Sequence, residues 1–132
     1  FHNALKKMNG TVVFLDFEYF GWDDPVKLIC DFAFHPGMEL NLVKRKHWFE
    51  KTLKLYGDSL LPRLSASWPL YGLCWVLILL NEFRSDIWER RRTADPAVKD
   101  SQVKSQFRQL KRSKQLLKFI DHSVQTNTFE FL

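Results

Sequence analysis

The stretch from residue 12 to residue 25, VVFLDFEYFGWDDP, constrains the fold of this chain more than any other. Its apolar start has the composition of a β-strand and leads directly into Asp16, with a second acid at Glu18. A glycine-containing turn follows, and Asp24-Pro25 is a good N-cap and first-turn pair for a helix. The stretch therefore predicts a strand that delivers carboxylates to its end, followed by a helix.

The residues before this stretch complete a β-hairpin. Asn9-Gly10 lies between two short runs of strand character, and this dipeptide favours a two-residue hairpin loop. If these two residues are the whole loop, Leu5 lies opposite Phe14. Counting outward in the same register places Asn3 opposite Asp16.

This register brings two potential metal ligands together. Directly opposed residues in an antiparallel pair have Cβ atoms roughly 4.5–5.5 Å apart. The amide oxygen of Asn3 and the carboxylate of Asp16 could then share a magnesium ion, which takes oxygen ligands. The alternative is that Asp16 simply ends a strand and that Asn3 is a surface loop residue.

The order of these pieces resembles a known enzyme family. His2-Asn3, a hairpin and then LDFE at residues 15–18 look like the catalytic loop and metal-binding segment of the aminoglycoside phosphotransferase and choline kinase-like family, which has the protein-kinase-like fold. In kinases the loop Asn and the later DFG Asp bind metal ions. The resemblance implies that Asn3 and Asp16 are metal ligands, with Asp16 the principal one, and that Glu18 is a candidate outer ligand.

The resemblance extends over the longer string DFEYFGWDDPVKLICDFAFHPGM and gives Asp31 a role. At the matching position the family has an Asp that braces the catalytic loop. As a brace, Asp31 would be largely buried and would accept hydrogen bonds from backbone N–H groups near Asn3. Its helical neighbours alone favour partial exposure, because an unpaired buried charge is costly.

Further expectations follow from the resemblance. It implies ATP and Mg²⁺ as cofactors, and phosphoryl transfer to a hydroxyl of a small-molecule acceptor. The family's catalytic Asp belongs about five residues before Asn3, upstream of Phe1. We therefore expect a C-terminal lobe that works with an N-terminal lobe of the same protein. By itself this chain, which has no Gly-rich loop or phosphate-pairing Lys, should transfer no phosphate.

The composition is that of one globular domain. With 132 residues, 45% of them hydrophobic and 15% aromatic, the chain can bury a sizeable core. We expect an α+β fold that is mainly α, with a short β-hairpin in residues 1–20 and a helical part in residues 24–122. Cys30 and Cys74 lie in apolar segments without CxxC spacing, which favours buried free thiols in a reducing compartment and a cytoplasmic location.

Capping residues and helical periodicity divide the helical part. The expected helices span residues 25–34, 42–56, 58–64, 68–83 and 96–121, with Asp24, Asn41 and Ser67 as N-caps and a loop from Arg84 onward. Residues 75–83 are expected to form the core. The residues expected to face inward are Val26, Ile29 and Ala33, then Leu42, Phe49, Leu53 and Tyr56, and in the last helix Val103, Phe107, Leu110, Leu117 and Ile120. The longest apolar run, residues 70–80, is shorter than the roughly 20 residues of a bilayer span, so no membrane partner is expected.

The net charge of +5 is concentrated near the C-terminus, where residues 84–118 contain eleven Lys/Arg and four Asp/Glu. One interpretation is a solvated helix face with an arginine cluster. A second is a basic helical binding module for nucleic acid or a protein partner without catalysis, although no nucleic-acid-binding signature is present. A third follows from the resemblance, which implies that the C-terminal helices build the acceptor pocket; a basic pocket would suit an anionic acceptor.

Overall fold

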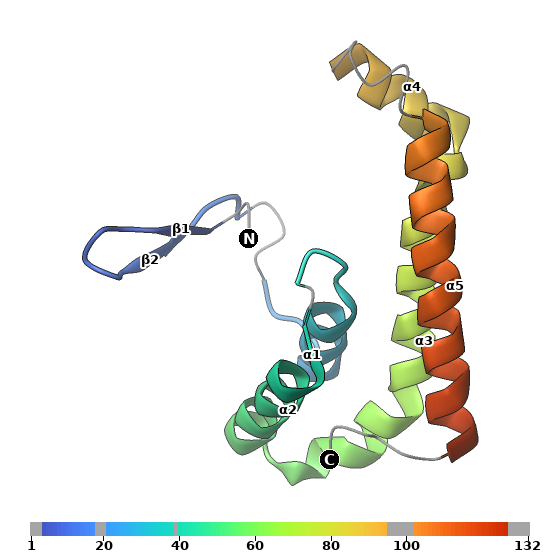
Figure 1. Cartoon of the computed structure of the whole chain (residues 1–132). Coiled ribbons are helices and arrows are strands. Elements are labelled where there is room, and N and C mark those ends of the chain that lie inside the picture. Colours follow the sequence, from blue (N-terminus) through green and yellow to red (C-terminus); the bar gives the residue numbers. More distant parts are fainter. Residues whose placement is uncertain (1–3, 18–20, 39, 95–101, 127–132) are drawn as a thin grey trace.

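The computed structural model of the chain describes residues 4–17, 21–38, 40–94 and 102–126. A two-stranded antiparallel β-hairpin comes first and helices follow, so the described part is mainly helical, as the sequence predicts. Figure 1 shows the hairpin extending away from the helices, and two long helices running side by side at the opposite edge.

The hairpin register differs from the predicted one by one residue. Strand β1 (Ala4–Lys6) pairs with β2 (Val12–Phe14), and Leu5 lies opposite Val13 rather than opposite Phe14. The prediction of a two-residue loop is therefore wrong.

The turn chemistry explains the longer loop. Lys7 N donates to the Thr11 carbonyl at 2.8 Å, and Gly10 N donates to the Lys7 carbonyl at 2.9 Å, which leaves three loop residues. Gly10 adopts φ 86°, a left-handed conformation that glycine accepts without steric penalty. A turn closed by a left-handed glycine is the usual three-residue hairpin loop.

The first two α-helices follow their predicted caps. Helix α1 (Pro25–Phe34) begins after Asp24, whose side chain accepts a hydrogen bond from Val26 N at 3.0 Å. Helix α2 (Leu42–Tyr56) begins after Asn41, whose side chain accepts from Lys44 N, and it ends at Gly57 with φ 89°. These boundaries are confirmed because caps act on backbone groups only a few residues away.

The predicted break at Ser67 is wrong. A 3-10 turn, η1 (Asp58–Leu60), leads into one continuous helix, α3 (Leu61–Leu79), and a second 3-10 turn, η2 (Leu80–Phe83), follows it. The helix passes through both Ser67 and Pro69. Leu64, Trp68, Gly72 and Val76 recur every four residues and are all buried, so tertiary packing on one face outweighs the local break signals.

The core lies where α1, α2 and α3 meet, earlier along α3 than predicted. The ring of Trp68 lies 4.1 Å from that of Phe34 and 5.4 Å from that of Phe49, measured between centroids. In the segment 75–83, Val76 and Leu79 are buried, whereas Leu77, Ile78 and Phe83 are exposed. The inward residues of α1 are confirmed. In α2, Phe49 and Leu53 are buried, whereas Leu42 and Tyr56 are exposed.

The loop expected after Arg84 is in fact helix α4 (Ser85–Ala94). Trp88 is buried and anchors this helix, and Arg91 forms an ion pair with the buried carboxylate of Glu82. Asp86 in the first turn and the arginines in the last turn also suit the helix dipole. An acid followed by arginines is the pattern in the sequence that indicates a helix in residues 85–94.

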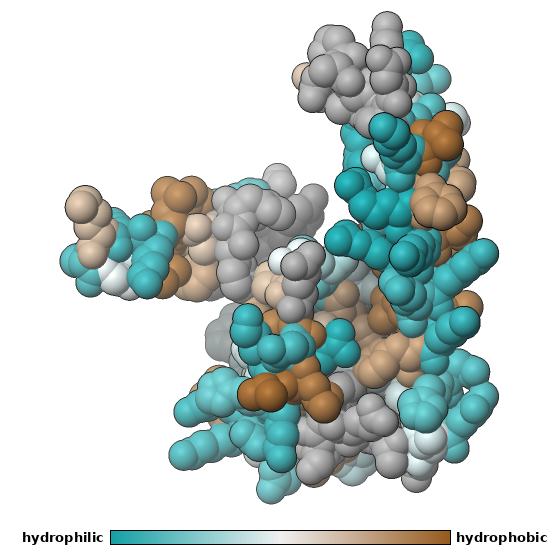
Figure 2. All heavy atoms as spheres, viewed as in Figure 1, coloured by the Kyte–Doolittle hydropathy of each residue, from teal (hydrophilic) through white to brown (hydrophobic). Residues whose placement is uncertain are grey.

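Helix α5 (Gln102–Thr126) packs along α3. Its predicted start at residue 96 lies outside the described residues. Ile120 is buried as expected, but Val103, Phe107 and Leu117 are exposed, and Ser113 is buried in their place. Figure 2 shows a largely hydrophilic face on this helix pair, with hydrophobic residues along one edge. The apolar stripe of the sequence therefore does not coincide with the face that packs on α3.

The apolar run of residues 70–80 is part of a longer helical segment, Asp58–Phe83. By length and composition it qualifies as one candidate span within the described residues, and 28% of its most apolar window is buried. A core helix passes the same test, and α3 supplies Leu64, Trp68 and Val76 to the core. One helix of this kind does not establish a membrane location.

Candidate functional site

Asp16 lies just beyond the end of β2 in a special backbone conformation. Its side chain is exposed and its φ is 62°. Of the residues that the structure describes, no other non-glycine residue has a positive φ. The left-handed region is unfavourable for an L-residue by roughly 1–2 kcal/mol, and such residues gather at ligand and active sites. The strand end thus presents a carboxylate on a left-handed residue, a conformation that Asp adopts more readily than most residue types.

The hairpin register bears on the predicted metal pair. A shift by one residue turns each side chain of a strand to the opposite face, so the described strands do not support a directly opposed Asn3 and Asp16. Asn3 and Glu18 lie outside the described residues, and their roles as metal ligand and outer ligand stay predictions.

No group of three or more His, Cys, Asp or Glu side chains in the described ranges could hold a metal ion. A magnesium site of the predicted kind would not produce such a group. Magnesium is usually bound by one or two protein groups together with waters and substrate phosphates. Carboxylate oxygens, such as those of Asp16, are ligands of the kind that this hard cation prefers.

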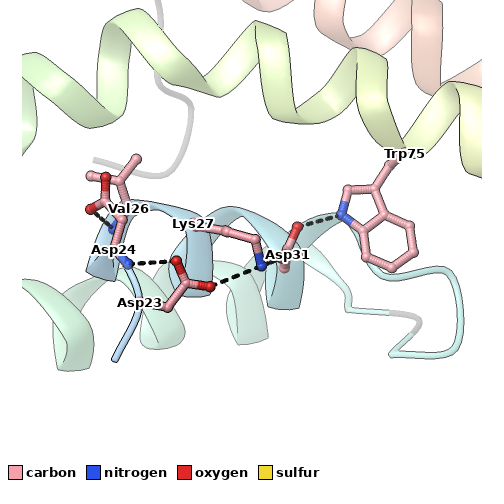
Figure 3. Close-up of polar contacts among 6 residues, drawn as sticks. All are labelled: Asp23, Asp24, Val26, Lys27, Asp31 and Trp75. Carbon is pink, nitrogen blue, oxygen red and sulfur yellow. Dashed lines mark hydrogen bonds and ion pairs between the residues drawn. The ribbon is translucent and has the colours of Figure 1, made fainter. Parts of the chain in front are cut away.

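Three carboxylates lie along α1, with Asp23 and Asp24 at its start and Asp31 nearly two turns later. Asp24 caps the helix and forms an ion pair with Arg63 of α3. Asp23 accepts a hydrogen bond from Asp24 N at 2.7 Å and lies 3.2 Å from Lys27 Nζ. The backbone hydrogen bond, and then Lys27, lower the pKa of Asp23. Bonds to Asp31 and then to Asp23 raise the pKa of Lys27. Figure 3 shows these side chains in a row along the helix.

Asp31 is less buried than a brace of the catalytic loop was expected to be. Its side chain is 35% exposed. One oxygen accepts a hydrogen bond from the indole Nε1 of Trp75 on α3, and the other from Lys27 Nζ, each at 2.9 Å (Figure 3). The prediction of a largely buried carboxylate is wrong because Asp31 lies at the edge of the α1–α3 contact. The expected donors near Asn3 fall outside the described residues.

A pocket of about 750 Å³ opens beside this row of acids, and we call it the acidic pocket. Asp23, Asp24 and Asp31 line it together with the aromatic side chains of Trp22, Phe32 and Trp75. Its volume falls in the range of small-molecule sites, roughly 300–1,000 Å³. Carboxylates beside aromatic faces attract ammonium groups through charge and cation–π interaction. Lys27 also lines this pocket and forms ion pairs with Asp23 and Asp31, while Asp24 pairs with Arg63. The lining still holds three acids against one lysine, and this excess favours a cationic small molecule over an anionic one.

Of the residues in this pocket, only Asp31 is a predicted site residue, and Asp24 is predicted only as an N-cap. Trp22, Asp23 and Asp24 are adjacent in the sequence and follow Gly21, so an acid–aromatic cluster was visible there. Trp75 lies on another helix, more than 40 residues from Asp31 in the sequence, in a segment that is predicted only to form the core. Only the fold reveals that it closes the same pocket.

Comparisons of the chain with protein-family models, with curated proteins and with solved structures gave no match.

Proposed function

We propose that the chain is the C-terminal lobe of an ATP-dependent phosphotransferase and that Asp16 is its principal magnesium ligand. The observation that carries this proposal is the left-handed backbone of Asp16 at the end of β2. Asp16 is also the residue that matches the metal-binding Asp of kinase-like enzymes. Magnesium would neutralise phosphate charge in such a site, and phosphoryl transfer depends mostly on positioning and charge neutralisation.

In this proposal the acceptor binds in the acidic pocket. Its lining includes Gly21, which follows Asp16 by five residues in the sequence. Its carboxylates favour a cationic acceptor, such as an amino-alcohol or an amino sugar, over the anionic acceptor expected from the basic C-terminal helix. In this proposal Asp31 and Trp75 position the acceptor, and Asp16 acts on the phosphates.

The metal site is tested by titrating the chain with Mn²⁺, a paramagnetic substitute for Mg²⁺, with and without ADP. Amide resonances around Asp16 should broaden first, and Mg²⁺ should reverse the effect. Asp16→Asn should abolish this local broadening, whereas Asp58→Asn, a matched change at an exposed acid of η1, should not. Broadening centred on Asp23 and Asp31 instead, or unchanged in Asp16→Asn, would remove the metal assignment.

The reaction is tested in the protein encoded by the complete reading frame. Magnesium-dependent ATP consumption should be stimulated by amino-alcohols or amino sugars, and it should fall at least 100-fold in Asp16→Ala. Asp31→Asn should raise KM for the acceptor more than it lowers kcat, because the residue contacts the acceptor and not the phosphates. An enzyme that tolerates Asp16→Ala would not be a phosphotransferase of this kind.

The second candidate is the basic helical binding module. Lys104, Arg108, Lys111, Lys114 and Lys118 are all exposed on α5, and this observation favours it. Binding to random nucleic acid that weakens steeply with salt would support this function. Magnesium-dependent nucleotide binding would support the first.

A further inference from the structure

Helices α1 and α2 lie on one side of the α3–α5 pair. Trp75 of α3 donates a hydrogen bond to Asp31 of α1, and the guanidinium of Arg45 on α2 lies over the Phe119 ring of α5. Hydrophobic residues are visible along the edge of the pair that lies away from α1 and α2 (Figures 1 and 2). The side of the pair that faces away from the core is therefore partly apolar.

Two contacts fix the alignment of the two helices. A Cβ at Gly72 would lie 2.6 Å from Ile120 Cδ1, and Gln106 Nε2 donates to the Glu82 carbonyl at 3.2 Å. Residue numbers therefore rise along α3 and η2 while they fall along α5, so the helices run antiparallel. Leu77 lies between Gly72 and Glu82 and is therefore level with the middle of α5.

Three leucines of α3 point away from α1. Leu73 and Leu77 are each two residues from Trp75, so at roughly 100° per residue they point to nearly the opposite side of the helix. Leu70 lies one turn before Leu73 and points the same way. The exposed fractions of Leu70, Leu73 and Leu77 are 63%, 42% and 65%. These leucines form an exposed apolar row on α3.

Helix α5 has an apolar row on the same side of the pair. Leu117 is two residues from Phe119 and therefore points away from α2. Seven residues make nearly two helical turns, and Val103, Leu110, Leu117 and Val124 follow one another at this spacing. Leu110 is partly exposed, and the other three are exposed, as is Phe107 beside them. Together with the leucines of α3, these residues form one surface, which we call the apolar face.

A row of lysines borders the apolar face. Lys104, Lys111 and Lys118 each follow a residue of the apolar row of α5, so they repeat at the same spacing, and all three are exposed. None of them forms an ion pair with a described residue. Asp121 is the one acid in the described part of α5, and it accepts a hydrogen bond from Gln125. The solvent edge of the apolar face is therefore cationic.

A lipid bilayer with anionic headgroups matches this arrangement. A helix that lies on a membrane has its apolar side at the acyl boundary and Lys or Arg on its polar side. Lysine stems cross the apolar boundary, and anionic lipids attract the ammonium groups. Lys114, one turn after Leu110, would reach the headgroups in the same way. A protein partner on this face would instead have to bury the charge of Lys114, which is costly.

The geometry favours association with the bilayer surface over a crossing of the bilayer. Helix α3 belongs to the segment that qualifies as a span by length and composition. Its other sides pack on α5 at Gly72 and on α1 at Trp75, so only one side is available to lipid. The sequence-based expectation of no membrane partner rested on the length of a span, which a helix lying on the surface does not need.

We infer that the apolar face docks the α3–α5 pair onto an anionic lipid bilayer, with Lys104, Lys111 and Lys118 at the headgroups. This inference is independent of the proposed phosphotransferase function. Neither Asp16 nor the acids of the acidic pocket belong to the apolar face. Loss of one would leave the other unchanged.

Co-sedimentation of the chain with vesicles tests the inference. Phosphatidylcholine vesicles with about 30% phosphatidylserine should bind the chain about tenfold or more tightly than vesicles of phosphatidylcholine alone. Added salt should weaken this binding, because it screens the lysines, but should not abolish it. Equal binding to the two kinds of vesicle, or no binding to the anionic ones, would overturn the inference.

Matched leucine variants test the apolar face itself. Leu77→Glu and Leu117→Glu should each weaken binding to the anionic vesicles about tenfold or more, because each places a charge at the acyl boundary. Leu55→Glu, at an exposed leucine of α2, should leave binding within about twofold. Circular dichroism checks that each variant keeps its helices. Equal losses at all three positions would mean that only the charge of the chain matters, and they would overturn the inference.

Lysine variants with equal changes in net charge test the cationic edge. The triple change Lys104→Gln, Lys111→Gln and Lys118→Gln should remove the preference for phosphatidylserine. The matched triple change on exposed lysines of α2 should keep it: Lys44→Gln, Lys51→Gln and Lys54→Gln. The same loss in both triples would mean diffuse attraction and would refute the assigned orientation.

A second copy of the chain is the competing occupant of the apolar face. Sedimentation velocity without vesicles should show a monomer, whose sedimentation coefficient Leu77→Glu leaves unchanged. A dimer that Leu77→Glu dissociates would assign the face to self-association and would overturn the inference.

Discussion

Asp31 joins two helices through its two oxygens. Oδ1 accepts from Trp75 on α3, and Oδ2 accepts from Lys27 one turn earlier on α1. The side chain is partly solvated, so its stabilising effect should be that of a single hydrogen bond and not that of a buried charge.

Asp31→Ala should therefore lower the free energy of unfolding by about 1 kcal/mol, because the Trp75 indole loses its acceptor. Urea denaturation of Asp31→Ala, Trp75→Phe and the double variant measures the coupling, which should be about 0.5–1.5 kcal/mol. Additive single effects would show that the hydrogen bond contributes nothing.

The two cysteines differ in environment, contrary to the prediction that both are buried. Cys30 is buried in the core, whereas Cys74 is exposed on α3. Burial, and then the charges of Asp31 and Asp24, raise the pKa of Cys30 to about 12. At pH 8 the Cys30 side chain is therefore a neutral thiol that reagents cannot reach.

One thiol per native chain should react with a disulfide reagent at pH 8, and two should react in denaturant. Cys74→Ser should abolish the native reaction, and Cys30→Ser should leave it unchanged. Cys30 should stay protected up to pH 10, because its thiolate is disfavoured in the folded state at that pH. Rapid labelling of Cys30 in the native chain would contradict its burial.

At the scale of elements, the contact between α3 and α5 depends on Gly72. A Cβ at this position would lie 2.6 Å from Ile120 Cδ1 and 3.1 Å from Phe34 Cζ. Three helices therefore approach one another where one residue has no side chain. Glycine is required here because it has no side chain and not because of its backbone freedom, since the φ of Gly72 is not positive.

Gly72→Ala should destabilise the chain by about 1–3 kcal/mol through overpacking. Adding Ile120→Val removes the closest atom, so the double variant should be less destabilised than the sum of the single changes. Gly21→Ala, where a Cβ meets nothing within 4 Å, is the matched control and should change stability by less than about 0.5 kcal/mol. Thermal or urea unfolding measures the stability of Gly72→Ala, Ile120→Val, the double variant and Gly21→Ala. A Gly72→Ala variant with unchanged stability would mean that the helices move apart without penalty.

At the scale of the whole molecule, opposite charges are segregated. The acids along α1 outnumber Lys27 in the lining of one pocket, and the lysines of α5 form an exposed stripe. Val103, Phe107 and Leu117 are also exposed on this helix. Val103 and Leu117 carry no charge to neutralise phosphates, so the stripe would bind nucleic acid mainly through the cations of a single helix, and binding of that kind is weak at physiological salt.

The chain should accordingly show no measurable binding to random DNA at 150 mM salt, and only weak, steeply salt-dependent binding at low salt. Fluorescence anisotropy with a labelled oligonucleotide measures this. Lys111→Glu with Lys118→Glu should remove the low-salt binding. Micromolar or tighter binding at 150 mM salt would favour the basic binding module over the phosphotransferase.

The sequence by itself determined the features that depend on neighbouring residues. Asp24, Asn41 and Gly57 are caps that act within one turn, and their helices begin or end where predicted. The position of Asp16 at a strand end is also local, since it follows an apolar β run. The left-handed φ of Asp16 was not predictable, because several backbone conformations are open to an Asp after a strand.

Only the tertiary structure decided which local signals prevailed. Ser67 and Pro69 mark a break, yet the packing of Trp68 keeps α3 continuous. Val103 and Phe107 were expected on the inner face of α5, but of that face only Ile120 packs tightly at Gly72, and Ser113 is buried where the apolar residues are not. The acidic pocket likewise required α1 and α3 to meet before Asp31 could face Trp75. Periodicity shows that a helix has an apolar face, but steric fit between helices decides which face is buried.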